Sequence, residues 1–274
     1  MTNDTEAPNG KGSDFGPLWS AKRSQSPIIG TAIHDGRHVR PGLRSLSALS
    51  EAERLREEDP FTAFLIGDLP NQIVFHRSRF EIDLNRRRDE AVYLRAEQAW
   101  GLKLWKDDLP QSEHVQSLMI HDDYYAMLRC FLEGIERSHG EFVLLDVHSY
   151  NHRRADPDTL TDPDLAPDVN IGTFSMDRGR WAHVVDPLMD HFRSFKAGSR
   201  PLDVRENIAF QGKGEQTRFV HEHFPKTGCA IAIEFKKIFM DEWTGQPHKA
   251  VLRELREAIS AAVPLLERSL RRHP

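Results

Sequence analysis

Three short apolar segments, far apart along the chain, constrain its fold more than any other feature. They cover residues 27–33, 142–147 and 229–235, and each is bounded by Gly, Pro or charged residues. Each is too short for a core helix, yet its apolar residues are continuous enough for a strand buried on both faces. We therefore interpret the three segments as central β-strands. Residues 80–84 are a weaker candidate, because their apolar residues merely alternate with polar ones.

Helical patterns occupy the stretches between these segments. Apolar residues recur there at spacings of three and four, the period of one face of an α-helix. Strands that alternate with helices favour a sheet with one layer of helices on each face. We therefore expect an α/β fold, a three-layer αβα domain with a mixed, largely parallel central sheet. The expected helices cover residues 52–58, 124–138, 181–195 and 248–271.

Capping and breaking residues mark the ends of these helices. Ser50 and Glu53 form a capping box ahead of the first helix. Asp122 or Asp123 is the expected N-cap of the second. Pro264 should kink or restart the last helix, because proline lacks the N–H that a helix interior requires.

The first 26 residues are rich in Asn, Gly, Ser, Thr and Pro and show no apolar period. This composition predicts a flexible N-terminal arm over residues 1–26, followed by a single catalytic domain over residues 27–274. The arm lacks the apolar stretch of a secretion signal, and no run of about 18 apolar residues occurs. The formal net charge of −5 gives no electrostatic reason to bind nucleic acid. We expect a cytoplasmic protein without nucleic-acid or membrane partners, and the oligomeric state stays open.

Titratable residues stand at the ends of the three apolar segments. His34 follows the first, His148 follows the second, and Glu234 lies near the end of the third. Because chemistry gathers beyond the carboxyl ends of parallel strands, the three side chains are expected to converge in one cleft. A lone histidine at a strand end is more often a surface residue, and Glu234 alone fits an ion pair with Lys236 or Arg79. Their joint placement favours a reactive site.

The same residues fit a zinc hydrolase, which needs about three His or carboxylate ligands and one open position. His34 and His148 supply two of them, and the third is sought among Glu57, Glu58 and Asp59. Zinc acidifies water and polarises a substrate carbonyl. A carboxylate outside the coordination sphere must then move the proton to the leaving amine, and the glutamate of the third segment is our candidate.

Arginines are concentrated in a second stretch, residues 77–88. The planar guanidinium group grips carboxylates in bidentate fashion, and an asparagine adds a hydrogen bond. A basic run is usually a solvated face, and Arg87 and Arg88 fit that interpretation. Asn85 and Arg86 follow an apolar alternation and are better placed to turn inward, with Asp83 orienting the arginine or a neighbouring loop.

Taken in order, these motifs resemble those of the N-formylglutamate amidohydrolase family, which belongs to the wider fold group of zinc carboxypeptidases and aspartoacylase. The resemblance covers most of residues 27–245, and it is carried by the ordered set rather than by any single motif. The matching pieces are residues 34–36 (HDG), 57–62 (EEDPFT), 78–86 (SRFEIDLNR), 146–150 (DVHSY), 168–173 (DVNIGT) and 233–237 (IEFKK).

The resemblance implies a mixed sheet with one Zn²⁺ ion at its carboxyl edge. His34 and His148 match the two metal histidines of the family. Asp59 best matches the acidic position downstream of the first histidine, with Glu58 as the nearby substitute. The implied metal ligands are therefore His34, Asp59 and His148.

The resemblance also assigns the remaining site residues. Asn85 and Arg86 match the pair that holds the substrate's carboxylate in this fold group. Arg79 matches a preceding arginine that helps this grip or contacts the scissile carbonyl. Glu234 matches the general base.

The implied reaction is hydrolysis of the amide of an N-formyl or other small N-acyl amino acid, such as N-formylglutamate. The expected partner is therefore a small acidic N-acyl amino acid. One alternative is a metallo-carboxypeptidase that acts on peptide C-termini. Carboxypeptidases carry a glutamate three residues after the first histidine, whereas this chain has Arg37 there, which weakens that alternative. The other is a binding protein on the same fold that has lost catalysis, against which the retained histidines and base argue.

Overall fold

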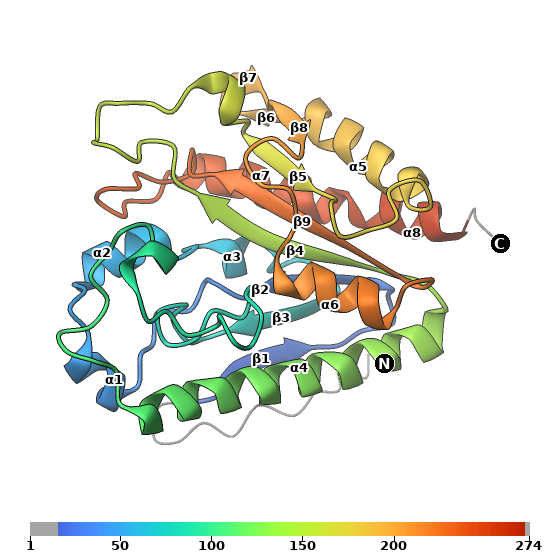
Figure 1. Cartoon of the computed structure of the whole chain (residues 1–274). Helices are drawn as coiled ribbons and strands as arrows, with labels where there is room; N and C mark the ends of the chain where they lie inside the picture. The colour runs from blue at the N-terminus through green and yellow to red at the C-terminus, as the bar shows by residue number, and fades with distance from the viewer. Residues whose placement is uncertain (1–15, 272–274) are drawn as a thin grey trace.

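The three apolar segments form β2 (Ile28–Ala32), β4 (Phe142–Tyr150) and β9 (Gly228–Lys236), which are neighbours at the centre of one sheet. The computed structural model describes residues 16–271 (Figure 1). Every residue of β4 is buried, as a strand with helices on both faces requires. The sequence-based prediction of these strands is confirmed.

The sheet has seven strands in the order β1-β3-β2-β4-β9-β5-β8. Strands β3, β2, β4 and β9 are mutually parallel, whereas β1 and β5 run antiparallel to their neighbours β3 and β9. The mixed, largely parallel sheet is therefore confirmed. The four outer strands are β1 (Trp19–Lys22), β3 (Asn71–Phe75), β5 (Val169–Gly172) and β8 (Val204–Glu206), and a separate ribbon pairs β6 (Lys196–Ala197) with β7 (Arg200–Pro201).

Helices cover both faces of this sheet. The alternation of side chains along β4 sends Phe142 and Leu144 into one core, with α4 and α6, and Val143 and Leu145 into the other, with α3, α5, α7 and α8. Figure 1 shows α4 along one side of the sheet and α8 along the other. None of the helices between residues 16 and 271 has the length and apolarity to cross a membrane. The helices are α1 (Pro41–Leu46), α2 (Glu51–Glu57), α3 (Thr62–Leu65), α4 (Gln111–His139), α5 (Ala182–Ser194), α6 (Glu215–His223), α7 (Lys249–Ala261) and α8 (Val263–Arg271).

The predicted helices are present, with one difference at the start of α4. The capping box of Ser50 and Glu53 starts α2, and the expected break near Pro264 separates α7 from α8. Helix α4 begins at Gln111, however, so Asp122 and Asp123 lie inside it rather than at its N-cap. Buried residues continue toward its N-terminus as far as Ser117, and this tertiary contact extends the helix beyond the local capping signal.

Residues 80–84 do not form a strand, which corrects the fourth strand candidate. The backbone turns back on itself here, because the N–H groups of Glu81 and Ile82 both donate to the carbonyl of Ser78. Glu81 and Asp83 are as deeply buried as Ile82, at 1% exposure each. The polar side chains in this stretch are therefore buried with the apolar ones, against charged partners such as Arg40 and Arg79, and do not form the exposed face of a strand.

Part of the predicted flexible arm, residues 19–22, forms strand β1. Strand β1 pairs antiparallel with β3, and Trp19 and Ala21 point into the core while Ser20 and Lys22 are exposed. The ring of Trp19 packs edge-on against Tyr124 of α4, with 6.1 Å between the ring centroids. Residues 1–15 of the predicted arm lie outside the described residues.

The central position of β4 predicts a large stability cost for truncating its core side chains. We expect Leu144→Ala, at a fully buried site, to lower the free energy of unfolding by about 2–5 kcal/mol, because it removes apolar contacts and leaves a cavity. Leu94→Ala, at a side chain that is 51% exposed, is the matched control and should change it by less than about 0.5 kcal/mol. Denaturant unfolding measures both, and equal losses would contradict the assignment of β4 to the core.

Candidate metal centre and active site

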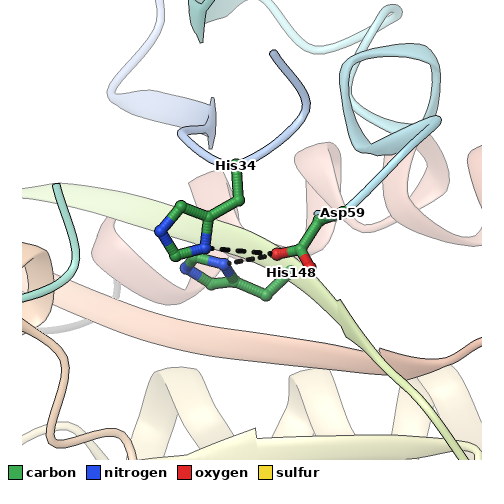
Figure 2. Close-up of side chains that lie close together, drawn as sticks. All are labelled: His34, Asp59 and His148. Atoms are coloured by element: carbon green, nitrogen blue, oxygen red, sulfur yellow. Dashed lines mark hydrogen bonds and ion pairs between the residues drawn. The ribbon is translucent and has the colours of Figure 1, made fainter. Parts of the chain in front are cut away.

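His34, Asp59 and His148 meet at the carboxyl edge of the sheet. His34 lies just after β2, His148 belongs to the last part of β4, and Asp59 follows α2. All three are buried, and one nitrogen or oxygen from each lies within 4.8 Å of the others. Figure 2 shows both imidazole rings directed at one carboxylate oxygen. Oδ2 of Asp59 lies 2.9 Å from Nδ1 of His148 and 3.4 Å from Nδ1 of His34.

Two further carboxylates fix how the imidazoles face this point. Nε2 of His34 lies 2.7 Å from Oδ1 of Asp83, and Nε2 of His148 lies 3.1 Å from Oδ1 of Asp146. With each Nε2 placed to donate to one of these outer carboxylates, the Nδ1 atoms, which here face the carboxylate of Asp59, are the ring atoms that would coordinate a metal ion. A histidine with a carboxylate behind it is the usual arrangement around a protein-bound metal.

The electrostatics of the group also fit a cation. Burial opposes the charge on Asp59, but the two imidazoles outweigh it and hold the pKa of this carboxyl well below its usual range. Burial likewise opposes the charge on Asp83, and Arg79 and His34 keep its pKa low. Among the described residues, the buried Nδ1 of His34 has no hydrogen-bond partner. A buried polar atom without a partner is costly, and a metal ion shared by the three groups would satisfy it.

The peptide unit that links Glu58 to Asp59 is held by hydrogen bonds at both its N–H and its carbonyl group. The N–H of Asp59 donates to the carbonyl of His34 at 2.9 Å, so the two ligand-bearing loops are joined directly. The preceding carbonyl, that of Glu58, accepts from Nζ of Lys237 at 2.8 Å, and the same Nζ also donates to the carbonyl of Arg56 at 2.6 Å. Lys237 is only 1% exposed, and burial lowers its pKa to about 8.

A buried network reaches the second histidine from the helical layer. Tyr124 of α4 donates to Oε1 of Gln216 in α6, and Nε2 of Gln216 donates to Oδ1 of Asp146 at 2.5 Å. The hydroxyl of Thr31 in β2 donates to the same oxygen at 3.0 Å. Asp146 therefore has a fixed position from which to orient the ring of His148.

The loop after His34 requires glycine at position 36. A Cβ atom there would lie 2.2 Å from the backbone carbonyl carbon of His76, which is well inside van der Waals contact. Any other residue would force this loop away from the end of β3. The short motif that begins at His34 is therefore explained by a close approach of two backbone segments.

Of the three candidates for the third ligand, only Asp59 faces the histidines. Glu58 accepts a hydrogen bond from Ser78 at 2.5 Å and lines a different cavity, beside Arg37 and Arg54, where burial raises its pKa to about 7. Glu57 forms an ion pair with Arg154 at 3.2 Å.

The three side chains open onto a cleft of about 140 Å³. Glu234 lies beside His148, because the two residues are direct partners in the parallel pairing of β4 with β9. The glutamate is partly exposed to the cleft, and burial raises its pKa to about 8. The cleft is lined by His34, Glu57, Asp59, Arg79, Asn85, Trp100, His148, Ser149, Tyr150, Asn151, Arg154, Phe210, Glu234 and Lys237.

The predicted substrate-binding residues take different positions. Asn85 lines the cleft, and its Nδ2 lies 3.4 Å from Nε2 of His148. Arg79 also lines it and is held by Asp83 at 2.9 Å. Arg86 is not among the described residues that line the cleft, since its guanidinium group donates to the carbonyl of Gln98 at 2.7 Å. A role for Arg86 in substrate binding stays a prediction that this arrangement does not support.

Sequence reasoning gave no role to several residues of the cleft, among them Trp100, Arg154 and Lys237. Lys237 lies three positions after Glu234, inside a motif that the sequence did single out. Arg154 follows the end of β4 by a few residues, and this position beyond the carboxyl end of a predicted strand could have marked it as a candidate site residue. Trp100 comes from an irregular stretch whose path is set by tertiary contacts, and its sequence context gives no signal.

Comparisons with solved structures show the same fold in other proteins. The crystal structure of N-formylglutamate amidohydrolase from Ralstonia eutropha JMP134 has a TM-score of 0.71 and 16% identity, over 92% of this chain and 98% of that one. The gene product Atu2144 from Agrobacterium tumefaciens has a TM-score of 0.56 and 16% identity, over 90% and 96%. At such identities the likeness shows the fold alone. No functionally curated protein gives a significant match.

The sequence model of a protein family gives the family itself. The N-formylglutamate amidohydrolase model matches residues 26–240, well over half of the chain. This span contains both histidines, Asp59 and Glu234. The chain therefore belongs to the N-formylglutamate amidohydrolase family.

Proposed function

We propose that the protein hydrolyses the amide bond of a small N-acyl amino acid, such as N-formylglutamate, with one zinc ion held by His34, Asp59 and His148. The observation that carries this proposal is the convergence of the two histidines and one buried carboxylate on a single point beside Glu234. Two nitrogens and one oxygen, with room left on the cleft side, are a donor set that zinc hydrolases use. Family membership supports amide hydrolysis as the reaction class.

A zinc ion bound there would act as a Lewis acid that polarises the amide carbonyl and makes water a stronger acid. The chain's own residues supply the rest. Asp83 and Asp146 hold the Nε2 side of both imidazoles, so that Nδ1 faces the site and little reorganisation is needed when the substrate enters.

Glu234 is the proposed general base and acid. It takes the proton from the attacking water and returns it to the leaving amine, which otherwise would depart as an unstable anion. Its pKa, raised to about 8 by burial, is near neutrality, so it can both accept and release a proton during one turnover.

The cleft limits the size of the substrate. A volume of about 140 Å³ is below the roughly 300–1,000 Å³ of pockets for drug-sized ligands, and it suits a single modified amino acid. Arg79 and Asn85 in its wall offer donors for the carboxylate next to the amide. In the carboxypeptidase alternative, a glutamate would stand at position 37, but Arg37 is exposed and lines a separate cavity.

The choice between these two activities is tested with the purified, zinc-loaded protein. N-formyl-L-glutamate and a short N-blocked peptide with a free carboxyl terminus are assayed side by side by following the release of formate or of the terminal amino acid. We expect formate release and no measurable peptide cleavage, because the cleft is too small for a peptide on both sides of the scissile bond. Peptide turnover without deformylation would reject the proposal.

Metal binding is expected to depend on His148. Equilibrium dialysis with elemental analysis should find one zinc ion per wild-type chain, and zinc should raise the melting temperature because it binds only the folded state. His148→Ala should lose this ion and the activity, since it removes one of three ligands. His139→Ala, at an exposed residue that ends α4, is the matched control and should bind zinc normally. Stoichiometric zinc in His148→Ala would refute the ligand assignment.

Removing the base should separate catalysis from metal binding. We expect Glu234→Gln to lower kcat by about 10²–10⁴-fold, because the amide side chain cannot take up the proton. Zinc content should stay at the wild-type level, since Glu234 is not one of the three ligand residues. Steady-state kinetics and elemental analysis measure the two effects, with the exposed Glu257→Gln as control. Wild-type kcat in Glu234→Gln would exclude this role.

A further inference from the structure

Arg154 presents a guanidinium group at the outer part of the catalytic cleft. It lies on the loop after β4, and its side chain is 43% exposed although it lines the same cleft as the metal ligands. Arg79, the other arginine of the cleft, is only 13% exposed. The cleft therefore has one arginine in its interior and a second one near solvent.

The guanidinium group of Arg154 is held in place before any ligand binds. Its Nη1 and Nη2 donate to the two carboxylate oxygens of Glu57, both at 3.2 Å, and Glu57 is almost fully buried. The backbone carbonyl of Arg154 accepts from Nη2 of Arg56 at 2.6 Å, which ties the loop to α2. A guanidinium group has five N–H donors, so donors remain for a ligand. A fixed cation loses little conformational entropy on binding.

Trp100 bridges the two arginines. The guanidinium carbons of Arg79 and Arg154 lie 4.9 Å and 5.5 Å from the centroid of its ring. Trp100 is 44% exposed and has a φ of 55°, a left-handed conformation that non-glycine residues rarely adopt. Strained residues of this kind cluster at functional sites, because the surrounding structure must impose the conformation. The ring and both cations thus form one arrangement in the wall of the cleft.

This arrangement matches a substrate with two carboxylates. When the amide of an N-acyl amino acid lies at the metal ligands, its α-carboxylate stays close to the amide and its side chain extends away. The interior Arg79 suits the first group, and Arg154 near solvent suits an acid at the end of the side chain. Resting on the proposed function, we propose that Arg154 is a specificity-determining residue of this cleft and binds the carboxylate at the end of the substrate's side chain.

The test compares two substrates that differ in one charge. The zinc-loaded wild type and Arg154→Met are assayed with N-formyl-L-glutamate and with its neutral isostere N-formyl-L-glutamine. We expect the wild type to prefer the glutamate derivative, and Arg154→Met to lower the ratio of the two kcat/KM values by about 10-fold or more, because a charged hydrogen bond is lost for one substrate only. Arg154→Lys, which keeps the positive charge but lacks the bidentate guanidinium group, should retain part of the preference for the glutamate derivative.

Arg87→Met is the matched control, since Arg87 is exposed and lies outside the cleft lining among the described residues. It should leave the ratio unchanged. Equal losses for both substrates in Arg154→Met, or a wild type that does not discriminate between them, would overturn the inference while leaving amide hydrolysis intact.

A binding measurement keeps the inference independent of turnover. Calorimetric titration of the zinc-loaded protein with L-glutamate and with L-glutamine should show tighter binding of glutamate to the wild type. Arg154→Met should reduce this difference by a similar factor. If neither formyl substrate is cleaved, the proposed function fails, yet a charge-dependent difference in binding still supports the role of Arg154, and equal affinities reject it.

Discussion

The carboxylate of Asp59, facing two buried imidazoles, is the interaction on which the site depends. A buried carboxylate is costly unless charged hydrogen-bond partners surround it. Here His34 and His148 stand on one side, while Lys237 fixes the carbonyl that precedes Asp59 on the other. Asp59 also joins two loops, because its backbone N–H donates to the carbonyl of His34. Ligand geometry and backbone geometry are thus set by one short stretch of chain, and a metal ion would complete a site that is already in place.

The register of the central strands places the catalytic groups around this point. Parallel pairing sets His148 of β4 directly beside Glu234 of β9, and a shift of one residue would turn the glutamate to the opposite face of the sheet. Behind the ring of His148, Asp146 is held by Gln216 from the helical layer. The αβα architecture therefore does more than bury apolar surface. The helices on one face of the sheet also supply the hydrogen bonds that orient His148, a proposed metal ligand.

Sequence reasoning succeeded where local patterns match local structure. The continuous apolar segments gave the central strands, and the capping box gave the start of α2. Residues 80–84 were mistaken for a strand, because alternation also arises when polar side chains are buried against charged partners, as Asp83 is. Strand β1 was missed because four residues at a sheet edge carry too short a pattern, and their pairing with β3 is a long-range contact.

For the site, the sequence by itself determined the chemical groups: two histidines after apolar strands, an acidic run after a capped helix, and a glutamate at the end of the third strand. It could do so because strand ends in a parallel sheet share one edge. Only the tertiary structure decided which acid of the run faces the histidines, since the end of α2 and the loop after it direct the three carboxylates to different partners: Glu57 to Arg154, Glu58 to Ser78 and Asp59 to the histidines. The same holds for the arginines. Arg86 contacts Gln98 while Arg154 lines the cleft, because the orientation of a long side chain depends on contacts with residues that are distant in sequence.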